Sequence, residues 1–272
     1  MRVLVSGIKG RMGSLVATTV QKADDMELVG GVDPKAIIKN FLSKTSPFYD
    51  DSEVPLFEDL DAAIKATNPD CVIDFSLPSA VFANITSCIN AGINCVVGTT
   101  GLSSEHMNML ASLLGKVPKS CVFIAPNFTI GAVLMMRFAQ MAAAYFPDAE
   151  VLEFHHNGKV DAPSGTATST AKMIAQIRTA HDIKSKSPGS ESELEGLNGA
   201  RGAILDGVAI HSIRSNAFMA SQEVLFGSTG ERLSIRHDST DRNAYMPGVL
   251  LAVRAIKNKV GLIVGLENLM DI

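Results

Sequence analysis

The sequence has little excess charge and no long hydrophobic run, and each of these shortages excludes a class of protein. Its 272 residues carry a net charge of −4, and the basic residues are scattered, which does not favour a nucleic-acid partner. No run approaches the roughly 18 apolar residues that a membrane-spanning helix needs. The N-terminus reaches Gly7 after three apolar residues, too few for a signal peptide. We therefore expect a cytoplasmic protein with no membrane or nucleic-acid partner.

Cysteine is also scarce. The four cysteines are Cys71, Cys88, Cys95 and Cys121. Each lies in an apolar stretch and none forms a CxxC pair, so we expect buried, free thiols in a reducing compartment. The composition, 46% apolar and 19% charged, is typical of a globular protein. A chain of this length is expected to form one large domain or two modest ones.

The first half of the chain alternates short β-branched segments with helical patterns. Strands are predicted at 3–6, 28–32, 71–75, 93–97 and 121–125. Helices are predicted at 11–22, 59–66, 79–91 and 104–114. This alternation predicts an α/β fold, with a Rossmann-like, doubly wound parallel sheet and helices on both of its faces.

The pattern changes after Asn127. The predicted elements there are a long helix at 130–146, a strand at 151–155, a helix at 166–178, strands at 203–213, 222–227 and 232–237, and a helix at 245–257. Three strands so close together favour a second, α+β domain with a mixed or antiparallel sheet. We place the dinucleotide-binding domain at 1–127 plus 241–272, and a substrate-binding domain at 128–240. The loop 185–202 is long enough to be functional or mobile.

A glycine-rich loop follows the first predicted strand and opens the first predicted helix. It reads Gly7, Ile8, Lys9, Gly10, Arg11, Met12 and Gly13. In a dinucleotide fingerprint, Gly7 permits a tight turn, Gly10 lets the backbone approach a pyrophosphate, and Gly13 lets the helix pack against the strand. The spacing departs from the standard form, because Lys9 stands at the usual second glycine. Asp33, at the end of the second strand, strengthens the motif because its carboxylate can bind the adenosine ribose.

The choice of nicotinamide nucleotide is left open by these residues. The carboxylate of Asp33 repels a 2′-phosphate and so favours NAD. Lys9, Arg11 and Lys35 are nearby cations that offset this repulsion. We therefore expect NADH or NADPH as cofactor, and the use of both is our hypothesis.

Three further loops follow strands at the carboxyl edge of the predicted sheet, where α/β proteins bind ligands. They are Gly98, Thr99, Thr100 and Gly101; Ala125, Pro126, Asn127 and Phe128; and Asp74, Phe75 and Ser76. Small residues there can lie under a nicotinamide ring, and hydroxyl groups can bind its amide. Each loop taken alone is also compatible with an ordinary turn.

The segment 153–166 concentrates ionisable and turn residues. His155, His156 and Lys159 follow a predicted strand, and histidine or lysine can move protons near neutral pH. Ser164, Gly165 and Thr166 precede a predicted helix, whose first N–H groups can bind an anion such as a carboxylate. An ordinary helix-capping loop is the alternative. No third and fourth ligand at zinc spacing accompanies the histidines, so we predict no metal site.

Several of these motifs together resemble the 4-hydroxy-tetrahydrodipicolinate reductase family, also called dihydrodipicolinate reductases. The resemblance spans nearly the whole chain. It rests on 7–13, 74–76, 97–101, 127–128 and, above all, the string 155–167, HHNGKVDAPSGTA. It implies a homotetramer that reduces a cyclic dicarboxylate imine of lysine and diaminopimelate synthesis with NAD(P)H. Hydride is transferred from the nicotinamide, and a proton is added at the neighbouring carbon.

The resemblance also implies residue roles. His155 and Lys159 would form the acid/base pair, His156 would contact one substrate carboxylate, and Ser164, Gly165 and Thr166 would hold the other. Which of His155 and Lys159 gives the proton stays open. Some relatives have Glu then Arg where this chain has Asp33 and Pro34, which leaves 2′-phosphate recognition open. Arg242 aligns with a family arginine of structural or cleft-lining role.

Two rival functions come from the same motifs. Another Rossmann reductase, acting on an amino acid or aldehyde, would share the glycine loop but leaves the segment 155–166 unexplained. A non-catalytic NAD(P)-sensing regulator would bind cofactor but would not need clustered histidine and lysine. NADH oxidation with the product of dihydrodipicolinate synthase as substrate separates these functions.

Overall fold

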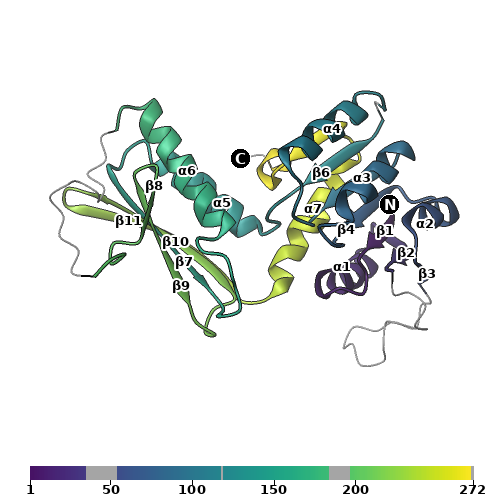
Figure 1. The fold of residues 1–272 in the computed structure, drawn as a ribbon, viewed down its shortest axis with the longest axis horizontal. Coiled ribbons are helices and arrows are strands. Elements are labelled where there is room, and N and C mark those ends of the chain that lie inside the picture. Colours follow the sequence, from purple (N-terminus) through teal and green to yellow (C-terminus); the bar gives the residue numbers. More distant parts are fainter. Residues whose placement is uncertain (35–53, 118, 184–196, 271–272) are drawn as a thin grey trace. The chain divides into compact units, whose positions relative to one another are not determined.

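The computed structural model describes residues 1–34, 54–117, 119–183 and 197–270, and it divides into two compact units (Figure 1). The first unit consists of Met1–Thr129 and Tyr245–Ile272, and the second of Ile130–Ala244. The domain limits predicted from the sequence, 127 and 241, lie a few residues from these limits.

A seven-stranded parallel sheet forms the centre of the first unit. Its order is β12-β6-β5-β4-β1-β2-β3, and every neighbouring pair is parallel. The strands are β1 (Arg2–Ser6), β2 (Glu27–Val32), β3 (Leu56–Phe57), β4 (Cys71–Asp74), β5 (Asn94–Val97), β6 (Cys121–Ile124) and β12 (Gly261–Val264). Strand β1 lies inside the sheet, between β4 and β2, and is buried on both faces, as its continuous apolar run requires. The predicted Rossmann-like sheet is confirmed.

Helices cover both faces of this sheet. The helices of the unit are α1 (Arg11–Gln21), α2 (Leu60–Thr67), α3 (Val81–Asn90), α4 (Ser104–Leu114) and α7 (Met246–Ile256), with a 3-10 turn at Leu266–Leu269. Apolar residues of α2, α3 and α4 form one core with β1, β4, β5 and β6. Helices α1 and α7 contact each other and pack on the sheet separately, α1 on β1 and β2 and α7 on β5 and β6. In parallel sheets of this kind, ligands bind at the carboxyl ends of the strands, among the loops that follow them.

Two strands of the first unit were not predicted. β3 has two residues, too few to show a sequence period, and it exists because Leu56 pairs with Gly31 of β2. β12 lies near the end of the chain and pairs with β6, from Gly261↔Cys121 to Val264↔Ile124. Both are sheet-edge strands, so tertiary pairing decides whether they form.

The second unit is a five-stranded mixed sheet with two helices on one face. The strands are β7 (Asp148–His155), β8 (Ala203–Leu205), β9 (Val208–Arg214), β10 (Ala220–Ser228) and β11 (Glu231–Ser239), in the order β11-β10-β7-β9-β8. The β7–β9 pair is parallel and the others are antiparallel. Helices α5 (Ile130–Ala142) and α6 (Gly165–Ala180) lie side by side on this sheet (Figure 1). A 3-10 turn at Arg242–Tyr245 contains Arg242 and leads into α7.

Two predicted elements of the second unit were wrong in extent. The strand predicted at 203–213 is two antiparallel strands, because Asp206 and Gly207 adopt positive φ of 50° and 77° and turn the chain back. The helix predicted at 130–146 ends at Ala142. Of the predicted loop 185–202, residues 185–196 lie outside the described residues, and 197–202 form turns.

Two further expectations concern the chain as a whole. All four cysteines are buried and free, as predicted. Within the described residues, no helix is both long and apolar enough to cross a membrane.

Candidate active site

The glycine loop joins β1 to α1 in a conformation that needs its glycines. Gly7 has φ of +76°, and a Cβ atom there would lie 2.4 Å from the carbonyl oxygen of Phe75. A Cβ atom at Gly13 would lie 1.9 Å from the carbonyl oxygen of Gly7. The predicted tight turn and close helix approach are therefore present. Gly10 is the N-cap of α1, and Arg11 and Met12 begin that helix, so its first N–H groups face the loop.

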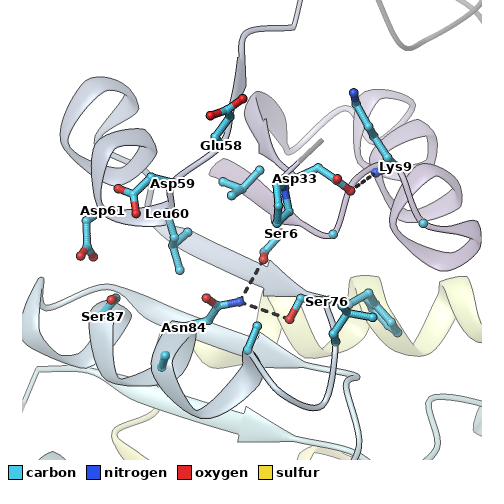
Figure 2. Close-up of a pocket in the computed structure, with 18 residues that line it drawn as sticks. Ser6, Lys9, Asp33, Glu58, Asp59, Leu60, Asp61, Ser76, Asn84 and Ser87 are labelled. Carbon is cyan, nitrogen blue, oxygen red and sulfur yellow. Dashed lines mark hydrogen bonds between the residues drawn. The ribbon is translucent and has the colours of Figure 1, made fainter. Parts of the chain in front are cut away.

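A cavity of about 630 Å³ lies beside this loop (Figure 2). Its size is within the usual range for small-molecule sites. Gly7, Lys9 and Gly10 line one side, and Asp33 stands at the end of β2. The backbone N–H of Lys9 donates to the Asp33 carboxylate over 3.3 Å (Figure 2). The structure thus brings the loop and the predicted ribose-binding acid together.

The same cavity has further carboxylates that the sequence analysis missed. Glu58, Asp59 and Asp61 also line it (Figure 2). Asp59 additionally caps α2, because its carboxylate accepts from the backbone N–H of Ala62 at 2.8 Å. With Asp33, these acids make the described wall of the cavity predominantly negative. Lys35, predicted as a nearby cation, lies outside the described residues.

A buried carboxylate, Asp74, ties together the loops at the carboxyl ends of β1, β4 and β5. It accepts from Thr99 Oγ1 at 2.7 Å, Ser76 Oγ at 2.8 Å and Asn84 Nδ2 at 2.7 Å. The Asn84 amide also reaches Ser6 Oγ at 3.2 Å (Figure 2). Asp74 therefore fixes Ser76 and Asn84 directly and Ser6 through Asn84, and these three side chains line the cavity. Asn84 was missed, because one polar residue in a helix has no distinguishing sequence signal.

Aromatic packing brings together the three loops that contain Phe75, Gly98 and Phe128. The Phe75 and Phe128 rings lie 5.8 Å apart, and a Cβ atom at Gly98 would lie 2.2 Å from the Phe75 ring. The loops therefore meet through Phe75 and need glycine at 98. Of the other predicted cofactor residues, Ala125 is buried, Asn127 is half-buried, and Thr100 and Pro126 are exposed.

In the second unit, His155 ends β7 and contacts the fully buried Glu153. The Nδ1 atom of His155 is hydrogen-bonded to Glu153 Oε2. Arg214, on the neighbouring strand β9, donates from both terminal nitrogens to Glu153, over 2.8 and 2.9 Å. Burial raises the pKa of Glu153, but hydrogen bonds from His155, Arg214 and Ser212 outweigh it and lower that pKa to about 2. Glu153 is therefore ionised at neutral pH.

Lys159 belongs to the same hydrogen-bonded group. Its Nζ donates to both carboxylate oxygens of Asp161, over 2.8 and 2.9 Å, and this contact lowers the pKa of Asp161. Arg214 donates to the Asp161 carbonyl oxygen at 2.8 Å. The backbone N–H of Lys159 donates to the His156 carbonyl oxygen, so the segment His156–Lys159 turns and leaves the His156 side chain exposed. Both predicted proton-handling residues are thus connected through Arg214.

The N-terminus of α6 supplies the predicted anion-binding groups. Buried Ser164 is its N-cap, and Ser164 Oγ accepts from the backbone N–H of Ala167 at 3.2 Å. Gly165 and Thr166 begin the helix, where N–H groups have no partner within the helix. A Cβ atom at Gly165 would meet nothing within 4 Å, so open space lies beside these groups. The arrangement can accept a carboxylate.

The electrostatics of this group suit an anionic ligand. Lys159 pairs with Asp161, and His155 and Arg214 both pair with Glu153. No group of three or more His, Cys, Asp or Glu residues positioned to hold a metal occurs in the described part of the chain.

Comparison with known proteins matches both units. Residues 1–128 match the family model of the dihydrodipicolinate reductase N-terminus, and residues 131–270 match that of the C-terminus. The 4-hydroxy-tetrahydrodipicolinate reductase of Listeria welshimeri is 45% identical over 271 residues, covering 100% of both chains. That of Enterococcus faecalis is 45% identical over 270 residues, covering 99% of this chain and 100% of the relative.

Solved structures agree with this match. A dipicolinate-bound dihydrodipicolinate reductase from Paenisporosarcina sp. TG-14 aligns with a TM-score of 0.85, 41% identity and 99% coverage of each chain. A probable dehydrogenase from Thermotoga maritima aligns at a TM-score of 0.59 with 14% identity, covering 99% of this chain and 92% of its own, which shows a shared fold. With both units matched over nearly their whole length, the chain belongs to the dihydrodipicolinate reductase family.

Proposed function

We propose that this protein reduces 4-hydroxy-tetrahydrodipicolinate to tetrahydrodipicolinate with NAD(P)H, in lysine and diaminopimelate biosynthesis. The observation that carries the proposal is the linked group of His155, Lys159 and Arg214 in a chain of this family whose other unit has a dinucleotide loop. The relatives' names supply the substrate, and the side chains supply the chemistry.

The first unit fits a nicotinamide dinucleotide. Side chains at Gly7 or Gly13 would collide with backbone, so the loop is shaped for close approach, and the adjoining cavity accommodates a nucleotide. The residues that would hold the cofactor are Gly7, Ile8, Lys9, Gly10, Arg11, Met12, Asp33, Gly98, Thr99, Thr100, Ala125, Pro126, Asn127 and Phe128. When bound, the cofactor supplies hydride from its nicotinamide C4.

NADH is the better cofactor in this proposal, with NADPH also used. Asp33, Glu58, Asp59 and Asp61 line the cavity and repel a 2′-phosphate. Lys9, which lines it too, offsets part of that repulsion.

His155 and Lys159 handle the proton. Reduction of an unsaturated dicarboxylate places negative charge on the carbon next to the reduced one, and a nearby cation stabilises that charge. Lys159 is a cation held in place by Asp161, and His155 is held by Glu153. Either side chain can pass a proton to that carbon, and the donor then regains a proton from solvent, directly or through the other side chain.

The substrate carboxylates are bound by the neighbouring groups. Gly165 and Thr166 offer N–H groups and a hydroxyl at the positive end of α6, positioned by the Ser164 cap. His156, which lies earlier in the same segment, is exposed and binds the second carboxylate. The small cyclic dicarboxylate is thereby held at both ends.

The family resemblance further supports a homotetramer in the cytoplasm. Light scattering is expected to give a mass of about four times the 28.8 kDa of one chain. A monomer mass at enzyme concentrations that support full activity would reject the tetramer.

The direct test is NADH oxidation with freshly made dihydrodipicolinate synthase product. We expect NADH absorbance to fall only when both substrate and protein are present. Folded protein that binds NADH without consuming it would instead support a nucleotide-sensing regulator. Turnover of an amino acid or aldehyde, and not of this substrate, would support the other rival.

A further inference from the structure

Glu153 is a charged residue that the sequence analysis did not assign to the reaction. It is 0% exposed, yet its carboxylate is ionised and accepts from His155 and from both terminal nitrogens of Arg214. Replacing a whole buried ion pair of this kind with apolar residues often costs no stability, because desolvation cancels much of the attraction between the charges. A fully buried acid touching a proton-handling histidine therefore points to a role in the reaction.

The contact with Glu153 fixes which His155 nitrogen carries the proton. An ionised carboxylate can only accept, so Nδ1 of His155 must be the donor in this hydrogen bond. Neutral His155 is then the Nδ1–H tautomer, and its Nε2 remains free to take a proton. Protonated His155 carries a second proton on Nε2, and this is the proton that it can donate. The carboxylate thus orients the ring and keeps Nε2 as the working atom.

Arg214 holds this carboxylate and links it to Lys159. Parallel pairing of β7 and β9 sets Arg214 beside His155 and Ser212 beside Glu153. One Arg214 nitrogen donates both to Glu153 and to the Asp161 carbonyl oxygen, at 2.8 Å each. Because the Asp161 side chain holds Lys159, a single guanidinium sets the positions of both proton-handling residues.

The other side of Glu153 adds no competing charge among the described neighbours. Gln222 of β10 stands opposite Glu153 in the sheet register and is neutral. Its amide donates to Thr170 of α6, which packs on the same strands. The charges facing Glu153 are therefore those of His155 and Arg214.

We propose that Glu153 and Arg214 are positioning residues, which fix the tautomer of His155 and the placement of Lys159 for proton transfer. This inference rests on the proposed function for its kinetic readout. Its spectroscopic readout does not, because the tautomer exists without substrate.

The first experiment uses the unaltered protein. Selective ¹³C and ¹⁵N labelling of its six histidines, with His155 assigned from the spectrum of His155→Gln, reports the tautomer. We expect neutral His155 to carry its proton on Nδ1. A predominant Nε2–H tautomer would overturn the proposal without any variant.

The second experiment compares Glu153→Gln with Glu150→Gln. Glu150 lies on the same strand and also contacts a histidine, with 2.9 Å between Glu150 Oε2 and His211 Nε2, but it lies outside the proposed site. We expect Glu153→Gln to lower kcat about a hundredfold, the low end of acid–base contributions, with the KM for NADH within about twofold. The His155 spectrum should shift toward mixed tautomers. Glu150→Gln should leave kcat and the His155 spectrum unchanged.

A third variant covers the case in which Glu153→Gln fails to fold. Arg214→Lys keeps the positive charge but cannot bind Glu153 and Asp161 simultaneously through a planar fork. We expect it to fold and to lose kcat by about tenfold or more, again with little change in the KM for NADH. Full kcat with an unchanged His155 spectrum in either variant would refute the positioning role. An unaltered protein that lacks activity but shows the Nδ1–H tautomer would refute the proposed function instead.

Discussion

Replacing Gly13 with alanine tests the cofactor loop most sharply, because one methyl group would disturb the whole turn. The added Cβ would lie 1.9 Å from the Gly7 carbonyl oxygen, 2.6 Å from its carbon and 2.9 Å from Ile8 Cα. All three are backbone atoms, so no side chain can swing away to relieve the collision. The helix or the loop must move by more than an ångström.

That movement costs free energy, which can be measured as a weaker affinity for NADH. Gly7 accepts from the backbone N–H of Gly10 at 2.9 Å, and this bond shapes the turn. Overpacking of a close contact costs about 1–3 kcal/mol. Because about 1.4 kcal/mol is a factor of ten, the Kd for NADH should rise roughly 5- to 150-fold if the cost falls on the bound conformation. Part of the cost will show as a lower Tm.

The assay is a titration of NADH by calorimetry or by quenching of cofactor fluorescence, with thermal unfolding alongside. Gly115→Ala is the matched control, because Gly115 ends α4 in the same unit with ordinary φ of −60°. Its nearest neighbour to an added Cβ is an oxygen at 3.4 Å, an ordinary contact. A Gly13→Ala protein that binds NADH within twofold of the parent and melts like it would refute the reasoning.

The remaining predictions concern the proton donors, the nucleotide and acid stability. Lys159→Ala should lower kcat about a hundredfold with the Kd for NADH unchanged, since Lys159 lies outside the first unit. A kcat within about threefold of the parent value, measured by stopped-flow or steady-state kinetics, would exclude the acid role. Asp33→Ser should raise the ratio of kcat/KM for NADPH over NADH at least about tenfold, and an unchanged ratio would remove Asp33 from nucleotide choice. Because the folded pKa of Glu153 is lowered from 4.5 to about 2, its ionisation stabilises the fold above about pH 4.5, and this contribution is lost as pH falls toward 2. Chemical denaturation across that window should therefore show the stability of the parent approaching that of Glu153→Gln, whereas a constant difference would contradict the assignment.

The local sequence was sufficient to predict a feature wherever all the residues that form it lie in one short segment. The glycine loop needs only the spacing of Gly7, Gly10 and Gly13 between a strand and a helix, and the structure has that turn. The Ser164 cap likewise depends on a residue three positions before the N–H that it binds. Alternating strands and helices were enough to predict the parallel sheet.

Tertiary pairing of strands decided which distant side chains contact the site residues. Glu153 meets Arg214 across 61 residues of chain, and Asp74 meets Thr99 across 25, because neighbouring strands place their ends together. No pattern within either segment encodes such a meeting. The same holds for β3 and β12, whose few residues become strands through an existing sheet edge. The sequence alone thus determined the family and the two fold types, and it named the residues that we propose to react. Strand register in the folded chain decided which charges hold those residues in place.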